Sequence, residues 1–181
     1  MIKLRELEIK DVDGMLEWMH DPEIQKQFKV SMIQKTRMNA LDFIKNAKIQ
    51  AVNGGSVHYA VTDEADTYLG TISLKDINLV DKHAEYAISL RRCAQGQGVG
   101  YEATLKLLQI GFEQFGLVRI YLNVLSENIP AIHLYEKCGF TLEGEFRNHL
   151  FLRGKYRTLK WYGLLKEDYE NYKNNYHWKE R

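Results

Sequence analysis

The sequence predicts one three-layer α/β domain, in which helices cover both faces of a central, largely antiparallel sheet. The first observation behind this prediction is the mixed order of strands and helices along the 181 residues. The second is that two strands, over 85–90 and 118–124, each lead directly into a helix with clear start signals. A chain of this length without a Pro/Gly/Ser-rich linker or internal repeat is expected to be a single domain, residues 1–181.

The N-terminal third is predicted to hold one strand and two helices. Residues 2–8 alternate as a strand does, and Asp11 can cap a helix that ends before Pro22. A second helix is expected over 36–50, stopped by the turn residues at 53–55.

Besides the strands over 2–8 and 118–124, the sheet is expected to contain five strands around the two helices described below. They are predicted over 57–62, 68–76, 83–90, 141–152 and 158–165. The aromatic and basic end of the chain, 168–181, is either a flexible tail or a dimer contact, which leaves a homodimer open.

Residues 94–100 form a glycine-rich turn between a strand and a helix. Glycine lets the backbone approach a ligand closely, and the first amides of the helix have no intrahelical partner. The turn is therefore a candidate cradle for an anion, and a pyrophosphate suits it well. Its members are Gln95, Gly96, Gln97, Gly98, Val99 and Gly100.

Two familiar nucleotide-binding loops do not account for this turn. A dinucleotide fingerprint belongs in the first βαβ unit with an acidic residue about 20 positions later. Here the turn lies in mid-chain, and residues 120–123 contain no carboxylate. The Gly-Lys-Ser or Gly-Lys-Thr of a phosphate-binding loop is also absent.

A helix with clear start and stop signals is also expected over about 128–139. Asn128 is a good N-cap, Pro130 suits the first turn, and Gly139 suits the C-terminal stop. Ala131 and Tyr135 are four positions apart and therefore share one face of the helix.

Together, these two segments resemble the GNAT superfamily of acetyl-CoA-dependent N-acetyltransferases. Residues 95–100 match its R/Q-x-x-G-x-G/A loop, and residues 128–140 match its N-x-x-A-x-x-x-Y-x-x-x-G-F segment. The resemblance covers about residues 1–166 and is nearest to the ribosomal-protein alanine, spermidine and nucleotide-amino-sugar acetyltransferase branches.

The resemblance implies that two parallel strands splay apart and that acetyl-CoA enters between them. Backbone groups of Ile88, Ser89 and Leu90 would hold the pantetheine and polarise the thioester carbonyl. Asn128 and Ala131 would belong to the same cofactor site, which also includes Tyr135. In this family Tyr135 would be the general acid that protonates the departing thiolate, although a helix tyrosine can also simply pack in the core.

Glu85 is a candidate for handling the acceptor amine. An unperturbed primary amine has a pKa near 10, so deprotonation at pH 7 costs about 4 kcal/mol. Glu85 begins the strand before the glycine-rich turn and could order the amine or relay its proton through water. A strand-end carboxylate is equally often just solvated.

The acceptor is predicted from charge in the segment 24–50. Six cations in it oppose the single carboxylate Asp42; they are Lys26, Lys29, Lys35, Arg37, Lys45 and Lys48. This excess favours a phosphate-bearing acceptor such as a nucleotide-linked amino sugar, unless the cations are only a solvated helix face. The alternatives are an N-terminal alanine or serine of a ribosomal or other protein, a polyamine, or a CoA-binding sensor without activity.

Composition sets the remaining expectations. With 25 basic and 24 acidic residues, the net charge of +1 indicates neither nucleic acid nor membrane as a partner. The two cysteines and the six histidines show no metal-ligand spacing, although His58 and His149 could line an acceptor pocket. Without an apolar run of 18 residues or a signal peptide, a cytoplasmic location is expected.

Overall fold

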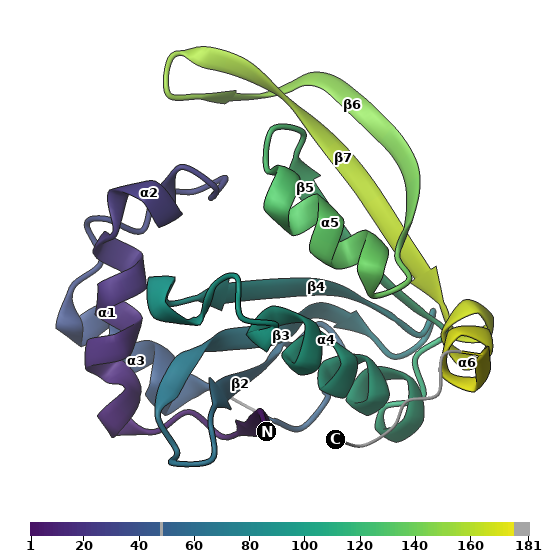
Figure 1. Ribbon diagram of the computed structural model, residues 1–181, viewed down its shortest axis with the longest axis horizontal. Coiled ribbons are helices and arrows are strands. Elements are labelled where there is room, and N and C mark those ends of the chain that lie inside the picture. The colour runs from purple at the N-terminus through teal and green to yellow at the C-terminus, as the bar shows by residue number, and fades with distance from the viewer. Residues whose placement is uncertain (48, 176–181) are drawn as a thin grey trace.

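Seven strands form one open sheet in the order β1-β2-β3-β4-β5-β7-β6 in the computed structural model, which describes residues 1–47 and 49–175 (Figure 1). All neighbouring strands pair antiparallel except β4 and β5, which run parallel. The strands are β1 (Lys3–Arg5), β2 (Val57–Thr62), β3 (Tyr68–Asn78), β4 (His83–Leu90), β5 (Arg119–Leu125), β6 (Thr141–Leu152) and β7 (Lys155–Leu165). The predicted largely antiparallel sheet is confirmed.

Helices cover both faces of this sheet, as the sequence predicts. They are α1 (Val12–His20), α2 (Pro22–Gln25), α3 (Arg37–Asn46), α4 (Val99–Gln109), α5 (Ile129–Lys137) and α6 (Lys166–Asn175). Shorter turns are η1 (Ile9–Asp11), η2 (Arg92–Ala94) and η3 (Ile110–Gln114), the last a π-helical extension of α4. Figure 1 shows α1 and α3 gathered at the opposite end of the view from α6, with the β6–β7 hairpin arching above α5.

Alternation along β2 shows how two separate apolar layers form. Val57 and Val61 join the core cluster that contains the α4 residues Ala103 and Leu107. Ala60 points the other way and joins the cluster formed with α1 and α3. Side chains along a strand alternate between faces, so one sheet can serve both helix layers.

Two expected elements are shorter in the structure. The first strand keeps only Lys3–Arg5, because the chain leaves the sheet over residues 6–8 and then forms η1 from Ile9. The second helix begins at Arg37 behind a capping box of Thr36 and Asn39, but ends at Asn46, where Ala47 takes an extended backbone.

The end of the chain forms a packed helix as far as the structure describes it. Tyr169 in α6 is 2% exposed, stacks on Phe112 at 4.8 Å and donates a hydrogen bond to Glu113 at 2.8 Å. Within the expected tail 168–181, residues up to Asn175 are therefore helical, and residues 176–181 lie outside the described part.

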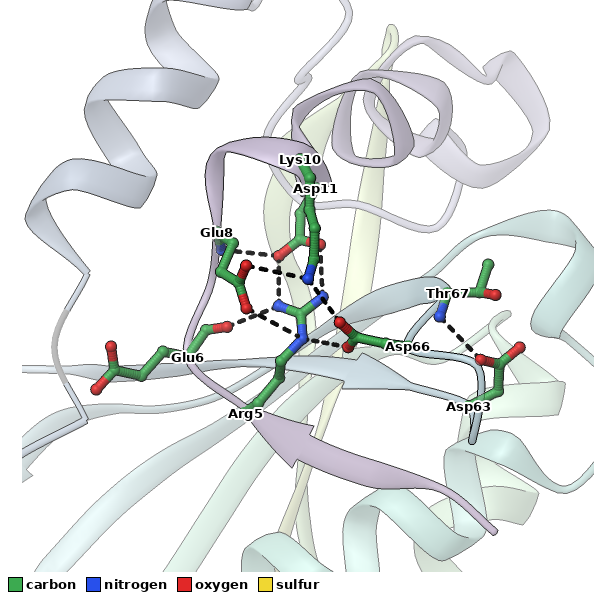
Figure 2. Close-up of polar contacts among 8 residues, drawn as sticks. All are labelled: Arg5, Glu6, Glu8, Lys10, Asp11, Asp63, Asp66 and Thr67. Carbon is green, nitrogen blue, oxygen red and sulfur yellow. Dashed lines mark hydrogen bonds and ion pairs between the residues drawn. The ribbon is translucent and has the colours of Figure 1, made fainter.

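A charged cluster around Arg5 fastens the N-terminal layer to the sheet (Figure 2). Arg5 donates to both carboxylate oxygens of Asp11, each at 2.8 Å, and its Nε donates to Asp66 at 2.5 Å. Asp11 is 1% exposed and also accepts from the Glu8 amide. Hydrogen bonds from Arg5 and Lys10 lower the pKa of Asp66 to about 2. The cluster joins β1, the start of α1 and the β2–β3 turn.

We expect Arg5→Gln to lower the free energy of unfolding by about 3 kcal/mol, because Asp11 would stay buried without its charged partner. Urea denaturation followed by circular dichroism measures this change. Lys10→Gln removes a cation from the exposed edge of the same cluster and is the matched control, for which we expect a much smaller shift. Equal losses in both variants would contradict this account.

Candidate active site

The parallel strands β4 and β5 separate after a short paired stretch. They pair at His83–Arg119, Ala84–Ile120 and Glu85–Tyr121, and no further β4–β5 pair forms among the described residues. Beyond this point β4 continues beside β3, and β5 continues beside β7. Main-chain groups of residues 86–90 that face the gap are therefore available to water or a ligand.

The glycine-rich turn closes one end of this gap. Gly96 and Gly98 have φ values of +72° and +80°, and a Cβ added to either would meet nothing within 4 Å. The left-handed backbone needs glycine, and the open space lets a ligand approach it. The side chains of Gln95 and Gln97 donate to the carbonyls of Leu90 and Cys93 at 3.2 and 2.9 Å, which braces the turn.

Helix α5 places Tyr135 on the opposite side of the gap. Asn128 caps the helix by accepting a hydrogen bond from the Ala131 amide at 3.4 Å. The Tyr135 side chain is 8% exposed, and its ring lies 5.6 Å from that of Tyr86 in an edge-to-face contact. Burial raises the pKa of Tyr135 well above its usual value of 10, so the phenol stays protonated and can act as a donor.

A cavity of about 1180 Å³ runs along the gap and joins most of the predicted site residues. Those that line it are Glu85, Ile88, Ser89, Leu90, Gln95, Gly96, Gly98, Gly100, Asn128, Ala131 and Tyr135. Gln97 and Val99 are not among its lining residues. Val99 is 8% exposed and packs in the core, whereas the Gln97 side chain is bonded to Cys93.

Glu85 is held in a polar cluster at the point where the strands separate. Its side chain is 14% exposed, and its Oε2 lies 3.3 Å from Lys75 Nζ. On the other oxygen, Oε1 lies 3.8 Å from Lys29 Nζ and accepts from Asn123 Nδ2 at 3.4 Å. Lys29 Nζ in turn donates to Asn123 Oδ1. Burial lowers the pKa of Lys29, and Glu85 partly opposes this effect.

The backbone that carries Lys29 is clamped from two sides. The buried Gln25 side chain donates to the Trp18 carbonyl at 3.3 Å and accepts from the Met32 amide at 2.7 Å. Arg153, in the β6–β7 turn, donates to the carbonyls of Gln25 and Phe28, the latter at 3.2 Å. These contacts set the position from which Lys29 enters the cavity.

The excess of positive charge in the segment 24–50 is smaller in the structure than in the sequence. Lys26 pairs with Glu23 at 2.6 Å, Arg37 pairs with Asp13, and Lys29 pairs with Glu85. These three carboxylates lie outside the segment, so the sequence count misses them. Among the described cations of the segment, Lys29 and Lys35 line the cavity together with Asp42.

Several polar residues of the site were not predicted because they depend on strand register. Lys75 lies opposite Glu85, and Ser73 lies opposite His58, whose Nδ1 is 2.7 Å from the Ser73 hydroxyl. His58 lines the cavity as expected, whereas His149 on β6 contacts Phe146 instead. The sequence does contain a signal for Ser73 and Lys75, because both are polar residues within the largely apolar strand 68–78.

The described residues contain neither a cluster of metal ligands nor a membrane-spanning helix. No group of three or more His, Cys, Asp or Glu side chains there is arranged to hold a metal ion. No helix in the same residues has the length and apolar character that crossing a membrane requires.

This chain is similar to known proteins in both sequence and structure. A family model described as an acetyltransferase (GNAT) domain matches residues 2–141. Spermidine N(1)-acetyltransferase from Vibrio cholerae serotype O1 is 34% identical over 113 residues, 62% of this chain and 65% of that protein. A putative ribosomal N-acetyltransferase from Bacillus subtilis is 31% identical over 104 residues, 58% of this chain and 57% of that protein. These sequence matches thus span less than two thirds of either relative.

The structural match is more extensive. A crystal structure of the Vibrio cholerae spermidine N-acetyltransferase in complex with CoA and spermine superimposes with a TM-score of 0.83 and 27% identity. The superposition covers 94% of this chain and 98% of that one.

We expect Gly98→Glu to abolish CoA binding, because the new carboxylate would fill the anion cradle and strain the backbone at φ +80°. Isothermal titration calorimetry with CoA measures this loss. Gly54→Glu introduces the same charge at φ +74°, away from the cavity, and should leave binding intact. Undiminished CoA affinity in the Gly98 variant would overturn the assignment of the turn.

Proposed function

Because the chain belongs to the family of GNAT acetyltransferases, we propose that it transfers the acetyl group of acetyl-CoA directly to a primary amine of a polyamine. The observation that carries this proposal is the position of Glu85. It lies where β4 and β5 separate, inside the cavity that also contains Tyr135 and the glycine-rich turn. This position supports a site in which an amine-binding group, an acid and an anion cradle lie along one gap.

In this proposal each group of residues supplies one requirement of the transfer. The turn 95–100 binds the pyrophosphate, and the main chain of residues 88–90, which has no partner on its β5 side, holds the pantetheine and polarises the thioester carbonyl. Glu85 receives the acceptor ammonium and takes its surplus proton, directly or through water. The amine nitrogen then bonds to the acetyl carbon as the carbon–sulfur bond breaks, and the nitrogen releases its second proton to water to leave a neutral amide.

Tyr135 completes the balance by donating its hydroxyl proton to the departing sulfur. Burial raises the pKa of Tyr135 because it disfavours a tyrosinate, and the same cause would act on a thiolate leaving into this cavity. A raised pKa on the phenol therefore does not prevent proton transfer to sulfur, and water can reprotonate the tyrosine afterwards.

A polyamine is the acceptor class with the best support. The Vibrio cholerae protein to which this chain is similar, both in sequence and in its solved structure, is a spermidine acetyltransferase by name, and the cavity lining includes the acidic residues Glu85 and Asp42. The prediction of a nucleotide-linked amino sugar rested on the excess of cations in the segment 24–50. That support is weakened, because three of these cations are paired with Glu23, Asp13 and Glu85.

An acceptor panel tests the proposal. Thiol release from acetyl-CoA would be followed with spermidine, a nucleotide-linked amino sugar and a peptide with a free N-terminal alanine or serine. We expect spermidine to give the highest kcat/KM. A preference for the sugar or the peptide would overturn the polyamine assignment, and CoA binding without any turnover of amines would favour a sensor.

We expect Tyr135→Phe to lower kcat by about 10- to 1000-fold with little change in CoA affinity, which is the scale of lost acid catalysis. Steady-state kinetics and CoA titration separate the two quantities. Tyr162→Phe removes another buried hydroxyl, which donates to Glu136 at 3.0 Å, from a residue outside the cavity lining. That control should keep its kcat, and an unchanged kcat in the Tyr135 variant would refute its role as the acid.

A further inference from the structure

We propose that Lys29 is an internal competitor for the acceptor: its ammonium occupies the place on Glu85 and Asn123 that the substrate amine takes. This inference rests on the proposed function and concerns the same site. It makes displacement of the Lys29 side chain a step in substrate binding, and it assigns to Lys29 control over the apparent affinity for cationic acceptors.

The contacts of Lys29 are those that a substrate ammonium would make. Its Nζ donates to Asn123 Oδ1 and lies 3.8 Å from Glu85 Oε1, at the point where the two parallel strands separate. A lysine ammonium and the terminal ammonium of a polyamine are the same group on an alkyl chain, with three N–H donors each. Either can satisfy this pair of acceptor atoms, but both cannot do so at once.

The charge around Glu85 makes this competition necessary. Lys75 holds Oε2 at 3.3 Å while Lys29 lies near Oε1, so one carboxylate already faces two cations. A third cation brought to Glu85 would meet uncompensated repulsion in a partly buried site. One of the two lysines therefore has to withdraw when a charged amine binds.

Lys29 is the residue better placed to withdraw. Lys75 is part of β3 and is paired in register with Glu85, whereas Lys29 lies in the connection between α2 and α3. The hydrogen bonds on that connection hold Gln25, Phe28 and Met32 and do not involve the Lys29 ammonium; both lysine side chains are 36% exposed, so the difference between them lies in the backbone that carries each one. Burial lowers the pKa of Lys29, which indicates that the contact with Glu85 does not fully offset the loss of hydration of the ammonium at this position.

The experiment compares spermidine kinetics, and spermidine binding by calorimetry in the presence of CoA, across three variants of the full chain. We expect Lys29→Met to lower both KM and Kd by about three- to tenfold, because binding no longer requires a competing ion pair to open. Lys29→Arg keeps a cation of similar reach and should stay near the wild type. Lys26→Met removes the exposed lysine paired with Glu23 and is the matched control, with unchanged constants.

A second background separates competition from a purely structural effect. In Glu85→Gln protein the contested carboxylate is gone, so adding Lys29→Met should give little further change in KM or Kd. An equal gain in both backgrounds, or an unchanged or raised KM in the single Lys29→Met variant, would overturn the inference. Failure of the proposed function gives a different result, namely no acetylation of spermidine by the wild type or any variant despite intact CoA binding.

Discussion

The separation of β4 from β5 is the constraint on which the rest of this molecule depends. Three parallel pairs, ending at Glu85–Tyr121, hold the two strands together, and past them each strand keeps a partner on its outer side only. Backbone groups cannot remain buried and unpaired. The main-chain groups that face the gap therefore need water or an extended ligand as hydrogen-bond partners.

The strands also determine where the chemical groups lie. The turn after β4 leads into α4, and the turn after β5 leads into α5, so the glycine cradle and Tyr135 approach the gap from its two sides. Glu85 lies in the last pair before the separation. A feature of sheet topology thus brings together residues that are up to 50 positions apart in the chain.

Ion pairs and buried polar side chains position the elements on the side of the gap where the acceptor is proposed to bind. Arg5 fastens the start of α1 through the buried Asp11, and Arg153 from the β6–β7 turn binds carbonyls in the segment that carries Lys29. The contacts of Arg153 thereby help to position Lys29 against Glu85. The charge of the proposed acceptor site therefore depends on contacts between residues that lie far apart in the chain.

The sequence by itself determined the fold class, the glycine-rich turn and the capped helix that carries Tyr135. These features depend on short-range rules of alternation, capping and backbone freedom, which act between neighbours in the chain. The bounds of β2 and β4, for example, follow directly from the residue pattern over 57–62 and 83–90. Helix α3 ends four residues before its expected stop, because the backbone of Ala47 is extended, and no glycine or proline in the sequence marks this position.

Only the tertiary structure decided the partners of Glu85 and the charge of its surroundings. Lys29, Lys75 and Asn123 come from a connection and two different strands, and register and clamping contacts bring them together. A count of charges along 24–50 cannot include Glu23, Asp13 or Glu85, which neutralise cations of that segment from outside it. Electrostatic interaction depends on distance in space, and distance in space is what the order of residues alone does not contain.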